Sequence, residues 1–508
     1  MNSKFKFLIM PKDFPLFFKV FALASCLMFI LSGYGFFVES FREARVFLYC
    51  GLTGLLILSL ISLATSNRNL RETGVMQLIS LIFLFLLLPL FLAVPTWIIV
   101  PGIAYIDAYL DMVGVLTTTG LRVFSEDLLS KSIHLWRAIV AWFGGGLILI
   151  VAFVILLPAA RGGFDVFSTQ KRISSFNRKL TLNERSSTLN KISKKLIPIY
   201  IALTVILWCF LTSLGTDGYT SLIRAFSILS TSGISGPYKF GSDEAGFWGE
   251  LIIIVFLLLA LSHNTLYYIT NKTDLKKVLL NRELRFGLFS VLFVSLLLFL
   301  KELNQINSDF ILHEVFINSC KLFWGNFFTA LSFISTNGYI SSYWSASQSS
   351  QVLPHISVIL LGLCLFGGGL ATTAGGIKLL RISVLFSSFS SETGKLLNPS
   401  SVIGINTTIK TLQVSVFMAW ISFMLFIVSI ASLIIILTIF GLLFEDAIIL
   451  AVACITTTGP IIEVLGLGSW LISDLSHISK IALVAGMVLG RLEILVVLSL
   501  LSYGFRGS

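Results

Sequence analysis

The chain has 508 residues, of which 56% are hydrophobic and only 12% are charged. An average soluble domain carries about 25% charged residues, so a core this apolar could not be covered in water. The composition excludes a soluble enzyme, a disordered chain and a nucleic-acid-binding protein. It predicts an all-α polytopic membrane protein.

Ten runs are long and apolar enough for spanning helices, which need about 20 residues each. They lie near 14–36, 45–65, 75–98, 134–160, 195–215, 247–270, 285–303, 353–377, 411–440 and 475–503. No small-residue cleavage site and soluble domain follow the first run, so we expect a retained helix rather than a signal peptide.

Basic residues gather in four segments that ten spans would place on one side, namely 1–19, 161–195, 271–285 and 378–410. Because short cytoplasmic loops are enriched in Lys and Arg, we expect these segments and both chain ends in the cytoplasm. The net charge of +11 then reflects topology and not a nucleic-acid partner. The six cysteines lack paired spacing and predict neither a disulfide framework nor a metal site.

Four eleven-residue segments align without gaps, at 110–120, 223–233, 328–338 and 449–459. Each copy ends in Gly, with Thr two residues earlier, Ser or Thr three earlier and a small residue six earlier. The apolar stretch before each Gly is about a dozen residues, which is too short to cross a bilayer and indicates a re-entrant helix.

The aligned segments predict four repeated units of span, short helix, Thr-x-Gly turn and span. The units occupy 71–165, 190–282, 283–382 and 405–508, and residues 1–70 hold two additional transmembrane helices. We expect the four units to be pseudo-symmetric around a central pore.

A single Thr-x-Gly after a short helix is commonly only a helix stop, with glycine as the left-handed residue. Four copies indicate more, because irregular backbone at membrane depth is tolerated only inside protein or beside a water-filled cavity. Four turns around one axis would offer backbone carbonyls and negative helix C-termini to a dehydrated monovalent cation.

Three longer stretches resemble a known family. They are DAYLDMVGVLTTTG (107–120) followed by WRAIVAWFGGG (136–146), FGGGLATTAGGIKLLRI (366–382) and GMVLGRLEILVVL (486–498). They are similar to segments of the Trk/Ktr/HKT potassium-transport superfamily, and the two extra N-terminal helices suit its TrkH type.

The resemblance implies a potassium-selective pore within one subunit of the cytoplasmic membrane, with potassium as substrate and no covalent cofactor. It also implies a homodimer in the lipid bilayer and a cytoplasmic ring of nucleotide-binding, TrkA-like regulatory subunits. The implied potassium-binding filter comprises Thr117, Thr118, Thr119, Gly120, Ser230, Thr231, Ser232, Gly233, Ser335, Thr336, Asn337, Gly338, Thr456, Thr457, Thr458 and Gly459.

Glycines bracket a short stretch of the third unit, where a straight helix is disfavoured because Gly costs about 1 kcal/mol against Ala. One interpretation is close packing of small residues between helices. The other is a broken helix across the pore below the filter, which the family uses as an intramembrane gate. The candidate gate residues are Gly368, Gly369, Leu370, Ala371, Thr372, Thr373, Ala374, Gly375, Gly376 and Arg491.

Arg491 lies deep in the last span, where a charge is expensive and indicates a function. The resemblance places it facing the pore beneath the filter. The alternative is a pairing with Glu493 or a side chain that reaches the interface. Lys378 and Arg381 are expected at the cytoplasmic boundary, and Glu463 is a candidate for the outer vestibule.

Two other functional classes remain open. A secondary transporter of sodium or another solute usually has ionisable residues near the midplane or inverted repeats, whereas these repeats run in one direction. An intramembrane enzyme needs a nucleophile with a base, or a metal set, and five scattered histidines do not supply one. We therefore expect a potassium pore and not an enzyme.

Overall fold

The structure, a computed structural model, describes residues 16–65, 74–152, 182–236, 246–262, 282–303, 312–344, 354–370, 372–397 and 408–492. These ranges are almost entirely helical, and their one β-bridge joins Phe366 to Ile377. The expected all-α membrane fold is confirmed. Within the described ranges, seven helices are long and apolar enough to cross a membrane.

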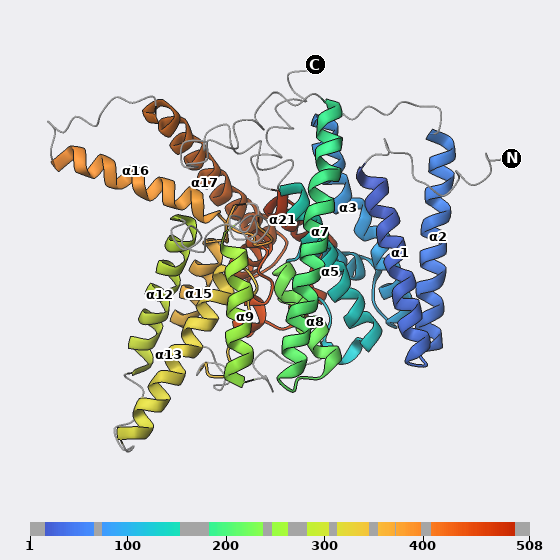
Figure 1. Ribbon diagram of the computed structural model, residues 1–508, viewed down its shortest axis with the longest axis horizontal. Coiled ribbons are helices and arrows are strands. Elements are labelled where there is room, and N and C mark those ends of the chain that lie inside the picture. Colours follow the sequence, from blue (N-terminus) through green and yellow to red (C-terminus); the bar gives the residue numbers. More distant parts are fainter. Residues whose placement is uncertain are drawn as a thin grey trace.

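Two helices, α1 and α2, stand at one edge of the molecule, and α16 and α17 project from the opposite side (Figure 1). The elements in chain order are α1 (Leu16–Phe37), α2 (Phe41–Thr65), α3 (Gly74–Ile99), α4 (Tyr105–Leu116), the 3-10 turn η2 (Glu126–Leu128), α5 (Lys131–Val151), α7 (Leu182–Ser213), α8 (Gly218–Ser230), α9 (Gly246–Leu261), α12 (Arg282–Leu303), α13 (Leu312–Ile334), α15 (Pro354–Leu365), α16 (Leu379–Leu397), α17 (Thr408–Ile439), α18 (Phe444–Thr456), α19 (Ile461–Val464), α20 (Ser469–Ser473) and α21 (His477–Leu492).

Three of the expected spans differ from the long helices. The run 353–377 is not one helix, because α15 ends at Leu365 and the next helix begins at Leu379. The glycines between them disfavour helical backbone. Helix α9 has 16 residues, and α21 has 16 residues up to Leu492, beyond which the chain lies outside the described residues.

The short helices before the Thr-x-Gly turns have 12 residues in α4, 13 in α8 and 13 in α18, as expected. The third does not fit, because α13 is one continuous helix of 23 residues. The segment 378–410, which we expected as a cytoplasmic loop, also differs, because its residues Leu379–Leu397 form the helix α16.

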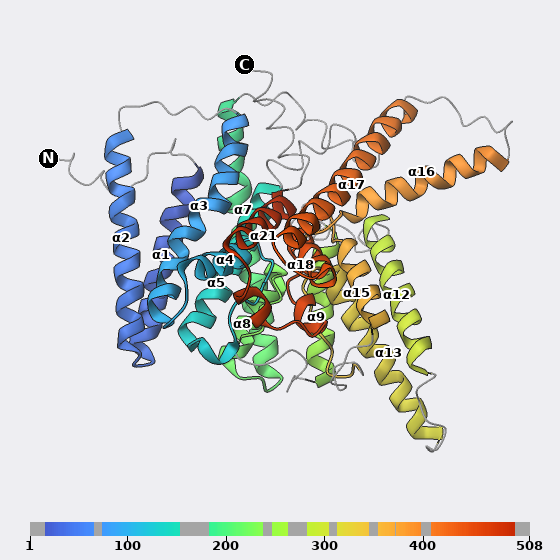
Figure 2. The ribbon, with the colours of Figure 1, turned by 180° about the vertical axis from the view of Figure 1, so that it is seen from behind.

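The four helices that precede the Thr-x-Gly turns make equivalent contacts in the bundle. Each packs against helices that come before and after it in the chain and against one helix of the preceding predicted unit. The contacts are α4 with α3, α5 and α21; α8 with α7, α9 and α5; α13 with α12, α15 and α9; and α18 with α17, α21 and α15. This order closes into a ring, part of which is visible where α4, α18 and α21 meet in Figure 2.

Candidate functional site

All four Thr-x-Gly loops contain a threonine in the left-handed backbone conformation. The φ angle is 55° at Thr118, 54° at Thr231, 59° at Thr336 and 56° at Thr457. In the described part of the chain, Glu39 is the one other non-glycine residue with positive φ. Such a φ is a genuine outlier for a β-branched residue and costs about 1–2 kcal/mol. The surrounding structure must therefore hold each loop in this shape.

The four helices that precede the loops end with the same backbone hydrogen bond. The N–H after the threonine donates to the carbonyl of the small residue five positions earlier. The pairs are Thr119 to Gly114 at 2.7 Å, Ser232 to Ser227 at 3.0 Å, Asn337 to Ser332 at 2.9 Å and Thr458 to Ala453 at 2.9 Å. This is the Schellman ending, whose left-handed position is usually glycine. In these loops the threonine, and not the glycine two residues later, occupies that position.

The glycines two residues later have a separate role in three loops. Gly120 and Gly233 both have φ of 67°, and Gly338 has φ of 75°. Gly459 is not in the left-handed region. It is instead required by close packing, because a Cβ there would lie 2.6 Å from the carbonyl oxygen of Thr119.

The first three loops contact one another through these glycines. A Cβ on Gly120 would lie 1.8 Å from the carbonyl oxygen of Ser232, and a Cβ on Gly233 would lie 2.2 Å from that of Asn337. The Gly233 N–H also donates to the side-chain oxygen of Asn337 at 3.1 Å. Asn337 stands where the other three loops have Thr or Ser, and it thus links two loops.

The fourth loop closes the ring. Gly338 lies against Pro460, which a Cβ would approach to 2.8 Å. The Gly459 N–H donates to the carbonyl oxygen of Thr119 at 2.6 Å. All sixteen candidate filter residues are buried, so the structure brings the four loops together in the interior of the protein.

The loop hydroxyls fall into two groups. The first hydroxyl of each loop donates to a carbonyl of its own helix, as Thr117 does to Val113 at 2.7 Å and Ser335 to Ser332 at 2.9 Å. Among the left-handed threonines, the buried hydroxyls of Thr118 and Thr457 have no hydrogen-bond partner in the described structure. A buried oxygen without a donor is suited to a cation.

The chain between α15 and α16 forms a closed loop. At its neck the Gly367 N–H donates to the Ile377 carbonyl at 2.9 Å. The Leu370 N–H donates to the carboxylate of the buried Glu283 at 2.6 Å. Ala371, a candidate gate residue, lies outside the described residues.

This loop lies against the ring of Thr-x-Gly loops. The Thr231 hydroxyl donates to the Thr373 carbonyl at 2.8 Å, and the Gly375 N–H donates to the Thr336 hydroxyl at 3.0 Å. A Cβ on Gly375 would lie 2.0 Å from the Thr457 hydroxyl oxygen. Three of the four left-handed threonines therefore touch the glycine-rich loop.

Arg491 is buried beside this loop, with 4% of its surface exposed. It donates to the Thr373 carbonyl at 2.6 Å, and its Nε and second terminal nitrogen have no partner among the described residues. The alternative acidic partner lies outside the described residues. Lys378 and Arg381, expected at the membrane boundary, are buried in protein, and Lys378 donates to the Ala374 carbonyl at 2.6 Å.

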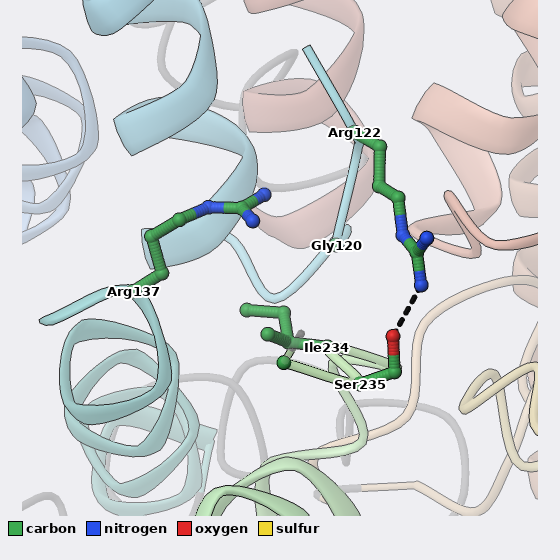
Figure 3. A pocket seen from close by; sticks show the side chains of 6 residues that line it. Gly120, Arg122, Arg137, Ile234 and Ser235 are labelled. Carbon is green, nitrogen blue, oxygen red and sulfur yellow. Dashed lines mark hydrogen bonds between the residues drawn. The ribbon is translucent and has the colours of Figure 1, made fainter. Parts of the chain in front are cut away.

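Charged side chains come shortly after the last glycine of the first and fourth loops. Arg122 pairs with Glu463 at 2.6 Å and donates to the Ser235 hydroxyl (Figure 3). Arg137 forms two hydrogen bonds to the fully buried Asp111, at 2.9 Å and 3.0 Å. Sequence reasoning singled out only Glu463 here. Charges inside apolar segments were the signal that could have identified the others.

Comparisons with known proteins relate the chain to cation transport proteins. A family model described as TrkH, cation transport protein, matches residues 252–503. The potassium uptake protein TrkG of Escherichia coli K12 is 28% identical over 411 residues, covering 79% of each chain, and TrkH of the same organism is 25% identical, covering 80% of each. The crystal structure of the potassium transporter TrkH from Vibrio parahaemolyticus superimposes with a TM-score of 0.77 at 21% identity, covering 96% of this chain and 98% of that one.

The chain belongs to the TrkH-type membrane subunits of the Trk/Ktr/HKT superfamily. The expected family is confirmed. Because the family model describes cation transport proteins, this TrkH-type chain is a membrane transporter and not an enzyme.

Proposed function

We propose that this chain takes up potassium across the cytoplasmic (inner) membrane through a selectivity filter made by the four Thr-x-Gly loops. One observation carries the proposal. Four loops with the same left-handed threonine contact one another in a closed ring, and each follows the C-terminus of a helix. The relatives named as potassium uptake proteins supply the identity of the ion.

The chemistry of the ring suits a monovalent cation. Backbone carbonyls replace the water around potassium without the strong hold of a carboxylate. Helix C-termini carry about half a negative charge, which favours a cation at the ring. The unpartnered hydroxyls of Thr118 and Thr457 provide two further oxygens.

The glycine-rich loop acts as the gate in this proposal. Its bonds to Thr231 and Thr336 hold it against the filter. The Arg491 guanidinium beside it places a positive charge in a low-dielectric region, where a like charge is strongly repelled. Conduction then requires the loop and Arg491 to move away from the ring.

The arrangement in the cell follows from charge and from the relatives. The positive-inside rule supports a multi-pass protein with both ends in the cytoplasm. We infer a homodimer with a nucleotide-binding, TrkA-like regulatory subunit beneath it, because the relatives are components of Trk systems.

The test is a flux assay with the purified chain in lipid vesicles that carry a potassium, rubidium or sodium gradient. We expect uptake of potassium and rubidium to exceed that of sodium. Equal flux of all three ions would refute the filter, and sodium-driven uptake of another solute would favour a secondary transporter.

A further inference from the structure

Arg122 connects three of the four filter loops. It lies two residues after Gly120 on the first loop. Its side chain pairs with Glu463, which follows the fourth loop, and donates to Ser235, which follows the second. Its side chain is 16% exposed and that of Glu463 is 29% exposed, so both are shielded from solvent but not sealed from it. We call Arg122, Glu463 and Ser235 the outer clasp.

The backbone beneath the clasp is held by a second ion pair. Arg137 of α5 donates to the Leu121 carbonyl at 3.3 Å while it is paired with the buried Asp111 of α4. A cavity of about 10 Å³ lies between Gly120, Arg122 and Arg137, which is room for about one water. Figure 3 shows Arg137 and Arg122 on either side of the loop segment that carries Gly120.

The clasp lies at the far end of the filter from the gate loop. Three of the four left-handed threonines touch the glycine-rich loop, which we call the gate loop. On the second loop the chain then runs from Thr231 through Gly233 to Ser235, which bonds to Arg122. In a pore for cations, an arginine at the mouth would repel the incoming ion. The carboxylate of Glu463, paired with Arg122 at 2.6 Å, cancels that charge.

We propose that Arg122 and Glu463 are positioning residues that form a neutral pair at the outer mouth, where their charge balance sets the apparent affinity for the entering cation. Their bridge also keeps the first, second and fourth loops in register, which preserves selectivity. This inference rests on the proposed potassium pore. It assigns the pair two separable effects, because charge acts on ion entry and the bridge acts on loop geometry.

Single neutralisations have opposite effects on affinity. Glu463→Gln removes a negative charge from the mouth and raises the KM for potassium, whereas Arg122→Gln removes a positive charge and lowers the KM. Two unit charges about 4 Å apart in water interact by about 1 kcal/mol, which is about fivefold in local ion concentration, so we expect shifts of up to that size. A merely structural role would move both KM values in the same direction.

The experiment measures KM and Vmax for potassium and rubidium uptake, and the potassium-to-sodium ratio, in vesicles carrying the full chain. The double variant Arg122→Gln with Glu463→Gln is expected to return KM to the wild-type value while selectivity stays reduced. Arg122→Lys retains the charge but loses the planar fork that reaches two partners, so it should lower selectivity with little change in KM.

The charge control is Glu445→Gln in the exposed first turn of α18, at the opposite end of that helix from the filter loop. At about 1.5 Å per residue the two ends lie roughly 17 Å apart, which exceeds the Debye length of about 10 Å at 0.1 M salt. We expect its KM to equal that of wild type. The shifts at the clasp should shrink when an impermeant salt is raised from about 10 to 100 mM.

If the two neutralisations shift KM in the same direction, or the double variant keeps either shift, the clasp proposal is overturned while the pore proposal stands. If wild-type vesicles take up no potassium, both proposals fail together. Should Arg122→Gln not fold, Glu463→Gln and Glu463→Lys are the graded series, with expected KM rises of about fivefold and about twenty-fivefold. Equal or absent rises would overturn the clasp.

Discussion

Replacement of Gly120 by alanine tests the filter most directly. The new Cβ would lie 1.8 Å from the carbonyl oxygen of Ser232, at a residue whose φ is 67°. The left-handed backbone costs about 1–2 kcal/mol and overpacking a further 1–3 kcal/mol. The Ser232 carbonyl must move by more than an ångström to relieve the collision. Since overpacking alone costs about 1–3 kcal/mol and about 1.4 kcal/mol is a factor of ten, we predict at least about a fivefold loss of potassium uptake or of selectivity over sodium.

The matched control is Gly102→Ala in the turn between α3 and α4. Gly102 has φ of 80°, but a Cβ there meets nothing within 4 Å. This variant carries the backbone strain without the collision. Potassium, rubidium and sodium uptake into vesicles is measured for both, with thermal melting in detergent to confirm folding. If Gly120→Ala transports like Gly102→Ala, the position of the loop carbonyls does not govern conduction and the reasoning is refuted.

Three further predictions concern the gate loop and the buried ion pair. Gly375→Ala should raise basal uptake, the opposite sign to the filter change, because its Cβ would lie 2.0 Å from the Thr457 hydroxyl and must push the loop off the ring; unchanged basal flux would contradict it. Arg491→Ala should raise the conducting fraction in current recordings, since it removes a buried charge and a bond to the Thr373 carbonyl; wild-type open probability would count against a gate. Asp111→Asn leaves a buried arginine unpaired and should destabilise the fold by about 3–5 kcal/mol, measured by chemical unfolding, with an unshifted transition as the contrary result.

Much of the architecture could be predicted from the sequence, because it depends on long apolar runs and on a repeated short motif. Apolar runs predicted the long helices, and the repeated Thr and Gly predicted four equivalent turns. Glycines predicted the break after Leu365. The left-handed threonines were not predicted, because Thr at positive φ contradicts local preference and depends on packing between loops that are far apart in sequence.

Contacts between units were the least predictable part of the site. Arg122 and Glu463 are separated by more than 300 residues, and no local pattern pairs them. No local pattern pairs Leu370 with Glu283 either, because they are 87 residues apart and meet only when the chain folds back on itself. The length of α13 was also missed, since apolar and polar residues mix throughout 312–334 and give no clear helix start.

One carbonyl of the glycine-rich loop accepts hydrogen bonds from two donors in different parts of the chain. Thr373 accepts from Thr231 on the second loop and from Arg491 on the last helix. A displacement of this single oxygen releases both donors in the same event. In the pore that we propose, both hydrogen bonds therefore break together, and openings should occur as one all-or-none step rather than as a series of partial levels.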